Sequence, residues 1–537
     1  MHALVQTIAF RGIDTIPVEV QVHIANGLPT IAIVGLADKA VAESRERVRA
    51  ALSSIGLALP PKRIAVNLAP ADVVKEGAHF DLPIALGLLM AMGVVPQDAV
   101  SDRVVLGELA LDGSIQQVSG VLSAAIAAAA TGQNLICPAA CGPEAALAAA
   151  IDMIAAPDLV SLLNHLKGVQ ILSPPEPKYL SAGRSYPDMK DLKGQDTARR
   201  VLEIAAAGGH NLLMVGPPGA GKSMLAARLA GLLPPLSAAE ALDVTMLHSV
   251  AGQLVDGGLI HTRPFREPHH SASMAALVGG GPRARPGEIS LAHNGVLFLD
   301  ELAEFARPVL DSLRQPLETG KVVVARANHN VTYPARFQLV VAMNPCRCGY
   351  LGDSSRACGS APACGRRYAA RVSGPMIDRF DLIIEVPEVT SDMLFTSKIS
   401  ETSHVIANRV AAARAYAATR PMQGADCANA QLQPDQLSEI VNFDDDAATL
   451  LKTAIEHSRL SARAYHKIQR VGPPVPSLIL TLKPQLAGRQ LPRRWLTGQC
   501  RCWREVGVAV RWHQSSAPRY QYLTIAEFPE FLLVRSR

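Results

Sequence analysis

Short apolar runs alternate with longer stretches of helical composition along most of the chain. In the N-terminal part, the predicted strands are 30–35, 63–68 and 104–109, and the predicted helices are 40–52, 80–89 and 120–130. Strands that alternate with helices in this way predict an α/β or α+β domain.

A second set of apolar runs begins after residue 190. The predicted strands are 211–215, 295–299, 337–344 and 382–386, and the predicted helices are 196–207 and 224–230. The two sets are separated by Ser173-Pro174-Pro175-Glu176-Pro177, which cannot continue a helix. The predicted organisation is an N-terminal domain 1–172, a linker 173–190, a core domain 191–395, a further region 396–470 and a tail 471–537.

A glycine-rich loop joins the strand 211–215 to the helix that follows. It reads G-x-x-x-x-G-K-S and consists of Gly216, Pro217, Pro218, Gly219, Ala220, Gly221, Lys222 and Ser223. Such a loop lets backbone N–H groups cradle phosphate oxygens, and the helix N-terminus adds a favourable dipole. Lys222 is expected to reach the β- and γ-phosphates of ATP, and Ser223 to bind Mg²⁺. The alternative is a chance glycine-rich turn, which the flanking strand and helix disfavour.

Two acidic residues end the next apolar strand. Asp300 and Glu301 directly follow 295–299, 78 residues after Lys222. In P-loop ATPases, the first acid holds Mg²⁺ through its water shell and the second polarises the attacking water. We expect these roles for Asp300 and Glu301, respectively. The alternative is an edge strand that ends in a solvated acidic turn.

Composition and net charge argue against some classes of protein but do not by themselves indicate a function. Although 49% of the residues are hydrophobic, no apolar run has the length and lack of charge of a membrane span, and the N-terminus lacks signal-peptide character. The net charge of +5 arises in the tail, because 471–537 contains ten basic and three acidic residues. The overall charge is therefore no evidence that the folded body binds DNA.

The nine cysteines are clustered, which is typical of a protein of the reducing cytoplasm rather than of a disulfide framework. Cys346, Cys348, Cys358 and Cys364 follow the strand 337–344 with the spacing C-x-C-x9-C-x5-C. Four thiolates so close together could bind Zn²⁺ tetrahedrally, and such a site would be structural because no position stays open for water. The alternative is a flexible loop of unpaired cysteines, one of which could be reactive.

The segments Gly107-Glu108-Leu109-Ala110-Leu111-Asp112-Gly113 and Val118-Ser119-Gly120 resemble the proteolytic domain of Lon-type proteases. The resemblance implies a ribosomal S5 domain 2-like fold, in which the proteases use a Ser–Lys dyad. Here 77–81 contains no serine, and Val121-Leu122-Ser123 stands where the lysine is expected. We therefore expect a non-proteolytic relative. The alternative, a displaced dyad of Ser119 or Ser123 with Lys75, has no support from spacing.

Three more site residues come from a resemblance to AAA+ ATPases. Asn344, at the end of a strand, resembles sensor 1, and its amide can both donate and accept near the γ-phosphate. Arg379 lies in 374–381, which resembles the arginine-finger segment of the branch containing MCM helicases and magnesium chelatase, and this implies contact with a neighbouring subunit's ATP. Arg463 resembles sensor 2. The alternatives are a turn-forming asparagine, an Arg379–Asp381 surface pair and a solvated helical arginine.

The whole span 193–470 resembles magnesium-chelatase-like AAA+ proteins, most specifically in 264–271 and 285–293. Together with the Lon-like domain, the domain order resembles the ComM/YifB family. The resemblance implies an N-terminal S5 domain 2-like α+β domain, then a P-loop AAA+ domain with a small helical lid at 396–470. It also implies a cytoplasmic homo-hexamer that uses ATP and Mg²⁺ to move on single-stranded or branched DNA, like the ComM branch-migration helicase of natural transformation. The alternative is a remodelling ATPase that acts on a protein partner, and an active protease is disfavoured.

The insert 264–293 contains two adjacent histidines and Glu267. Neighbouring side chains of a strand point to opposite faces, so His269 and His270 are not expected to bind one metal ion together. We expect loops that face the pore of the ring, with Arg283 and Arg285 as contacts for the DNA backbone. A solvated loop is the alternative.

The tail 471–537 has a different character. It contains all three tryptophans of the chain (Trp495, Trp503 and Trp512) and shows no helical period, although the resemblance implies further helices there. One hypothesis is a shift of reading frame near residue 471, which the other two frames of the coding DNA would test. The alternative is a basic, aromatic tail that binds nucleic acid.

Overall fold

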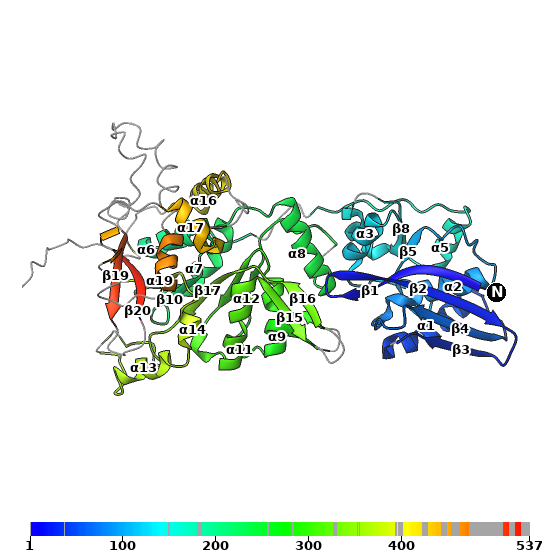
Figure 1. The fold of residues 1–537 in the computed structure, drawn as a ribbon, viewed down its shortest axis with the longest axis horizontal. Coiled ribbons are helices and arrows are strands. Elements are labelled where there is room, and N and C mark those ends of the chain that lie inside the picture. Colours follow the sequence, from blue (N-terminus) through cyan, green and yellow to red (C-terminus); the bar gives the residue numbers. More distant parts are fainter. Residues whose placement is uncertain are drawn as a thin grey trace, which may run out of the picture.

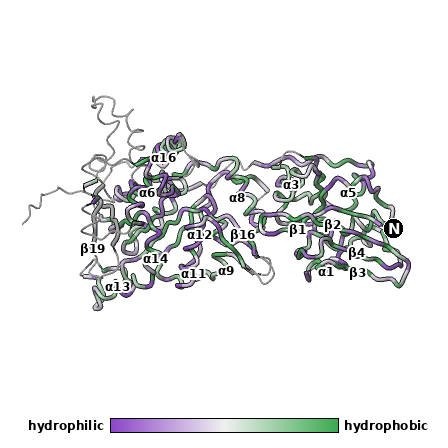
Figure 2. The backbone as a smooth tube through the Cα atoms, in the orientation of Figure 1, coloured by the Kyte–Doolittle hydropathy of each residue, from purple (hydrophilic) through white to green (hydrophobic). Residues whose placement is uncertain are grey.

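The computed structural model describes 2–36, 38–148, 151–179, 185–254, 257–281, 284–325, 330–351, 353, 355–391, 395, 401–420, 428–441, 448–449, 451–452, 462–471, 508–514 and 521–527. This part of the chain forms two bodies, each built on a seven-stranded sheet, which follow one another along the longest axis of the molecule (Figure 1). No described helix is long and apolar enough to cross a membrane, and hydrophilic positions interrupt the hydrophobic ones throughout both bodies (Figure 2).

The N-terminal sheet has the order β3-β4-β2-β1-β5-β8-β9. Its strands are β1 (His2–Arg11), β2 (Asp14–Ala25), β3 (Thr30–Val34), β4 (Arg63–Ala69), β5 (Arg103–Val105), β8 (Asn134–Pro138) and β9 (Met153–Ala156). The pairs β1–β2 and β2–β4 are antiparallel, and the other pairs are parallel. The mixed sheet is covered by helices, so the expected α+β domain is confirmed.

The helices of this domain explain its apolar runs. They are α1 (Lys39–Ser54), α2 (Asp81–Ala91), α3 (Val121–Ala130), the short α4 (Gly142–Ala145) and α5 (Leu159–Leu166). Every residue of α2 is buried, which accounts for its continuous apolar sequence. Pro83 is tolerated because it lies in the first turn, where no intrahelical N–H bond is lost.

The predicted strand 104–109 is wrong as a single element. It is divided into β5 and the short β6 (Glu108–Leu109), which pairs with β7 (Ile115–Gln116). The division occurs at Gly107, whose N–H donates to the His79 carbonyl and whose carbonyl accepts from the Leu82 N–H, both at 3.0 Å. The backbone at Gly107 thus bonds to the start of α2 instead of to a neighbouring strand.

The second sheet has the order β11-β14-β17-β10-β18-β20-β19. Its strands are β10 (Leu212–Val215), β11 (Phe265–Arg266), β14 (Val296–Leu299), β17 (Gln338–Met343), β18 (Leu382–Glu385), β19 (Val508–Gln514) and β20 (Gln521–Glu527). All neighbours are parallel except β19 and β20. The carboxyl ends of β10, β14 and β17 therefore meet at one edge, which is where ligands bind in open parallel sheets.

Two apolar clusters cover the faces of this sheet. On one face, α6 (Asp196–Gly208), α7 (Lys222–Leu229), α16 (Ser403–Ala418) and α19 (Ala462–Val471) pack on the strands. On the other face, α11 (Arg307–Ser312) and the hairpin of β15 (Lys321–Ala325) and β16 (Asn330–Pro334) do so. Of the tail, the structure describes only Val471, which ends α19, and the strands β19 and β20, so the frameshift hypothesis stays a prediction.

The two bodies touch at the β1–β2 turn and at α8 (Ala238–Val250). Gly12 has φ +72°, and a Cβ there would lie 2.6 Å from Val331 Cγ1 of β16, so the close approach requires glycine. On α8, the Ser249 hydroxyl accepts from the Gly120 N–H at 3.0 Å and contacts the Glu144 carboxylate. Burial raises the pKa of Glu144, so this contact couples a buried acid of one body to a helix of the other.

Candidate nucleotide site

The shape of the glycine-rich loop depends on three of its glycines. Gly216 passes so close to β18 that a Cβ would lie 2.2 Å from the Val386 carbonyl oxygen. Gly219 and Gly221 have φ +80° and +87°, a region that favours glycine, and a Cβ at either position would meet no atom within 4 Å. The loop thus curves between β10 and α7 with open space beside it, as a phosphate-binding loop requires.

Lys222 links this loop to the end of β17. Its Nζ donates to the carbonyls of Gly216 and Pro217 at 2.8 Å and to Asn344 Oδ1 at 3.0 Å. Burial lowers the pKa of Lys222, while the charges of Asp300 and Glu301 oppose that effect. The structure therefore brings Lys222 and Asn344 together.

Ser223 and Asp300 are also brought together. The Ser223 hydroxyl donates to Asp300 Oδ2 at 2.6 Å, and Asp300 Oδ1 accepts from the Glu301 N–H at 2.8 Å. A hydroxyl and a carboxylate oxygen side by side are the hard donors that Mg²⁺ prefers. The residues present therefore fit the Mg²⁺ that the sequence predicts.

Glu301 has an unusual backbone and a partner that the sequence did not reveal. Its φ of 52° lies in the left-handed region, which costs a side-chain-bearing residue about 1–2 kcal/mol. His270 Nδ1 lies 3.6 Å from Glu301 Oε2. A strained residue at the end of an interior strand is a candidate for function, and His270 is placed to orient it.

The expectation that His269 and His270 point to opposite faces is wrong. Their rings contact each other with centroids 4.0 Å apart, because this segment is not a strand and His270 begins a turn. His269 bonds to the Ser271 hydroxyl at 2.7 Å, whereas His270 faces Glu301. In the part of the chain that the structure describes, neither histidine belongs to a group of metal-ligating side chains.

Arg379 and Arg463 meet at Glu318 of α12 (Arg314–Thr319). Arg379 pairs with the Glu318 carboxylate, and Arg463 Nη2 lies 3.3 Å from the same oxygen. Burial lowers the pKa of Arg379, and repulsion by Arg463 adds to this effect. Asp381 instead accepts from the Asn211 N–H at 3.1 Å, so the alternative Arg379–Asp381 pair is not formed. The two arginines define one cationic surface, named here the Glu318 face.

The N-terminal domain does not assemble the displaced protease dyad. Lys75 is buried and donates to the Pro70 carbonyl. The Ser123 hydroxyl is buried and has no hydrogen-bond partner within the described residues, and Ser119 lies against Gly252 of the second body. Asp81 is fully buried and forms an ion pair with Arg47 at 2.6 Å. Asp81 belongs to 77–81, the segment in which a nucleophile is expected from the resemblance to Lon-type proteases. In this structure Asp81 instead forms a buried ion pair with Arg47.

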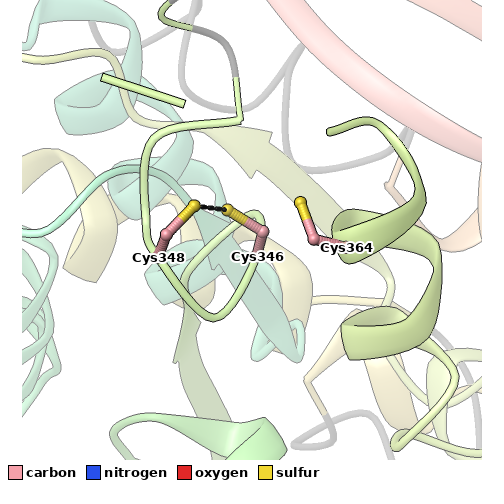
Figure 3. A group of neighbouring side chains, drawn as sticks. All are labelled: Cys346, Cys348 and Cys364. Atoms are coloured by element: carbon pink, nitrogen blue, oxygen red, sulfur yellow. Dashed lines mark hydrogen bonds between the residues drawn. The ribbon is translucent and has the colours of Figure 1, made fainter. Parts of the chain in front are cut away.

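Three of the four cysteines of the predicted zinc loop lie together (Figure 3). The sulfurs of Cys346, Cys348 and Cys364 are all within 4.8 Å of one another, and those of Cys346 and Cys348 are 3.0 Å apart. Cys364 comes from α13 (Ala363–Ala369), and the other two follow β17. Hydrogen bonds with Cys346 and with the backbone of Tyr350 lower the pKa of Cys348 to about 6.

Two hairpins project beside the sheet. One consists of β12 (Gly279–Gly280) and β13 (Arg285–Pro286), and the other of β15 and β16. The Tyr333 hydroxyl donates to the Ala284 carbonyl at 2.8 Å and joins them. Arg285 is exposed, whereas Arg283 lies outside the described residues.

Comparison with known families gives three matches along the chain. Residues 188–394 match the family described as "Magnesium chelatase, subunit ChlI". Residues 20–141 match "Subunit ChlI of Mg-chelatase", and residues 400–475 match "Magnesium chelatase, subunit ChlI C-terminal".

Two relatives are similar over most of their length. Competence protein ComM of Haemophilus influenzae is 43% identical over 476 residues, covering 87% of this chain and 92% of that protein. The uncharacterized protein YifB of Escherichia coli is 41% identical over 470 residues, with the same coverage. The magnesium-chelatase 38 kDa subunit of Rhodobacter capsulatus is 29% identical over 171 residues, which is 29% of this chain and 49% of that subunit.

Proposed function

The chain belongs to the ComM/YifB family of magnesium-chelatase-like AAA+ proteins, and we propose that it hydrolyses ATP as a homo-hexameric ring that moves on single-stranded or branched DNA. The main support is the pair of contacts at one sheet edge, Lys222 with Asn344 and Ser223 with Asp300. We propose the cytoplasm as its compartment, because the described cysteines are free thiols.

The residues of the site suggest a division of labour in hydrolysis. Ser223 and Asp300 would hold Mg²⁺, which supplies positive charge to the phosphates when it is bound. Lys222 Nζ would release the carbonyls of Gly216 and Pro217 and bind the β- and γ-phosphates of ATP instead. Asn344, whose Oδ1 lies 3.0 Å from that amine, would orient the γ-phosphate or the attacking water, and Glu301 would accept the proton of that water.

The Glu318 face supports the ring. Arg379 and Arg463 share Glu318, whereas Lys222 contacts the P-loop and Asn344, so the two arginines form a group separate from the nucleotide loop. A guanidinium that completes the ATP site of the next subunit requires a repeating head-to-tail interface, which closes as a ring. The proposal assigns both arginines to the neighbour's ATP.

The competing function is a remodelling ATPase that acts on a protein partner. The N-terminal domain does not separate the two functions, because residues 20–141 match a family that is itself described as a magnesium-chelatase subunit. Coverage favours the first function: similarity to ComM extends over 87% of the chain, against 29% for the magnesium-chelatase subunit. The test is the ATPase rate with and without single-stranded or branched DNA. Absence of both stimulation and binding at low salt would contradict a DNA motor.

The joined hairpins are the proposed contact with DNA. Arg285→Ala is expected to weaken DNA binding similarly for all sequences and to reduce the slope of log K against log salt by about 1, because one phosphate contact is lost. Binding would be measured by fluorescence anisotropy at several salt concentrations. Arg45→Ala, on the exposed side of α1, is the matched control. An unchanged slope for Arg285→Ala would remove Arg285 from the DNA path.

His270 is the proposed positioning residue for Glu301. His270→Ala is expected to lower kcat about 10-fold without changing the Kd for ATP, because an unrestrained Glu301 samples unproductive rotamers. His269→Ala is the matched control, since His269 bonds to Ser271 instead. Single-turnover hydrolysis and fluorescent-nucleotide binding would separate the two quantities. Equal losses in both variants would argue against a specific role for His270.

A further inference from the structure

The four-cysteine loop, 345–364, directly follows Asn344, and its Gly349 packs against Pro218 of the P-loop. We propose that it binds one structural Zn²⁺ through Cys346, Cys348, Cys358 and Cys364, and that this ion braces the P-loop against the end of β17. The zinc site stands on the loop geometry alone. Its effect on ATP binding rests on the proposed function.

The sulfur positions fit a tetrahedral zinc site. A Zn–S distance of about 2.3 Å places the sulfurs of such a site about 3.8 Å apart. The sulfurs of Cys346 and Cys348 are 3.0 Å apart, and the three sulfurs of Cys346, Cys348 and Cys364 all lie within 4.8 Å of one another, so small side-chain movements would reach this spacing. The cysteines are free, and 3.0 Å is well beyond the roughly 2.05 Å of a disulfide.

Cys358 supplies the fourth ligand. It is a free thiol that lies between Cys348 and Cys364 in sequence, outside the group of three sulfurs that are within 4.8 Å of one another, so its side chain would move toward them when the ion binds. Cys364 points toward Cys346 from α13, as Figure 3 shows. Four thiolates complete the coordination of zinc, so the site has a structural role and no catalytic one.

The loop is held in place by bonds that do not involve the cysteines. The Arg356 guanidinium lies over the Tyr350 ring at 4.5 Å and pairs with Asp353 at 2.5 Å. Its Nη1 also donates to Glu388, beyond the end of β18, at 3.2 Å. These contacts hold Tyr350, Asp353 and Arg356, which lie between Cys348 and Cys358 in sequence, in place beside the cysteines.

The same loop is packed against the P-loop. A Cβ on Gly349 would lie 2.5 Å from Pro218 Cδ, so the backbone at Gly349 packs directly against the Pro218 ring. Cys346 is two residues beyond Asn344, which accepts from Lys222. A zinc ion at the cysteines would therefore fix the end of β17 and the segment beside Pro218 together.

The first test measures zinc itself. Protein purified under reducing conditions without chelator is expected to contain one Zn²⁺ per chain by elemental analysis. Cys346→Ser and Cys364→Ser are expected to lose most of it. Cys141→Ala, a change at a buried cysteine of the N-terminal domain, is the matched control and should retain it. A wild-type protein without zinc that takes up none from added ZnCl₂, or a Cys346–Cys348 disulfide in mass spectra, would overturn the site.

The second test measures the effect of zinc on ATP binding. It uses the wild-type protein, so the result does not depend on whether a variant folds. Zinc is removed from the wild-type protein with a chelator and then restored with ZnCl₂. The Kd for a fluorescent ATP analogue is expected to rise about 5-fold or more and to return on restoration, a coupling typical of linked sites. An unchanged Kd would contradict the proposal that zinc holds the P-loop against the end of β17. Zinc content is measured without nucleotide, so a failure of ATP hydrolysis would contradict the proposed function and leave the zinc site standing.

Discussion

Replacing Glu301 with glutamine is expected to lower kcat for ATP hydrolysis by about 10²–10⁴-fold, the usual contribution of a general base. The Kd for ATP should change by less than about 3-fold, because Lys222, Ser223 and Asp300, which the proposal assigns to the nucleotide and Mg²⁺, are unaltered. The loss corresponds to about 3–5 kcal/mol of transition-state stabilisation. Glutamine keeps the size of the side chain but cannot accept the proton of the attacking water.

The chain offers a close control for this substitution. Glu304 lies on the next turn and pairs with Arg371 at 2.8 Å, away from Ser223 and Asp300. Glu304→Gln removes one negative charge from the same region, so general electrostatic effects should appear in both variants. Rapid-quench hydrolysis and fluorescent-nucleotide binding should show a large kcat loss in Glu301→Gln alone. Turnover near the wild-type rate in Glu301→Gln would refute the role assigned to this residue.

Most of the predictions made from the sequence rest on local motifs. The elements around the P-loop and Asp300 follow from short apolar runs that end in glycine or acidic residues, and the structure confirms strands β10 and β14 and helix α7 there. The contact of Ser223 with Asp300 could be anticipated because parallel strands end at one edge. The break at Gly107 could not, because it depends on hydrogen bonds to a helix about 25 residues earlier in the chain.

Contacts between residues far apart in the sequence could not be predicted from the sequence. His270 reaches Glu301 only because a turn in the insert packs against the end of β14, and no periodicity reports such a contact. Likewise, Arg379 and Arg463 were each recognised by resemblance, but their meeting at Glu318 depends on how α19 packs on the sheet. This tertiary arrangement changes the interpretation, because it groups the two arginines on one surface.

Replacing Arg379 with alanine is expected to lower kcat by about 10³–10⁵-fold, the range observed for arginine fingers. ATP binding to the isolated chain should persist, because Arg379 contacts Glu318 and Pro375 and does not belong to the Lys222 and Asn344 group. Arg371→Ala is the matched control, since Arg371 pairs with Glu304 instead. Assembly would be checked by light scattering, so that a loss of the ring is distinguished from a loss of chemistry.

Mixed rings test whether Arg379 acts on the neighbour. Glu301→Gln and Arg379→Ala subunits are each expected to be inactive alone. In a ring of both, the ATP site of an Arg379→Ala subunit keeps Glu301 and receives an intact Arg379 from a Glu301→Gln neighbour. If the sites work independently, random one-to-one mixing restores about a quarter of the wild-type sites, because half of the subunits have a competent site and half of their neighbours supply the arginine. A mixture that stays inactive after confirmed subunit exchange would mean that Arg379 acts within its own chain, and the Glu318 face would then not be the surface that completes the next subunit's site.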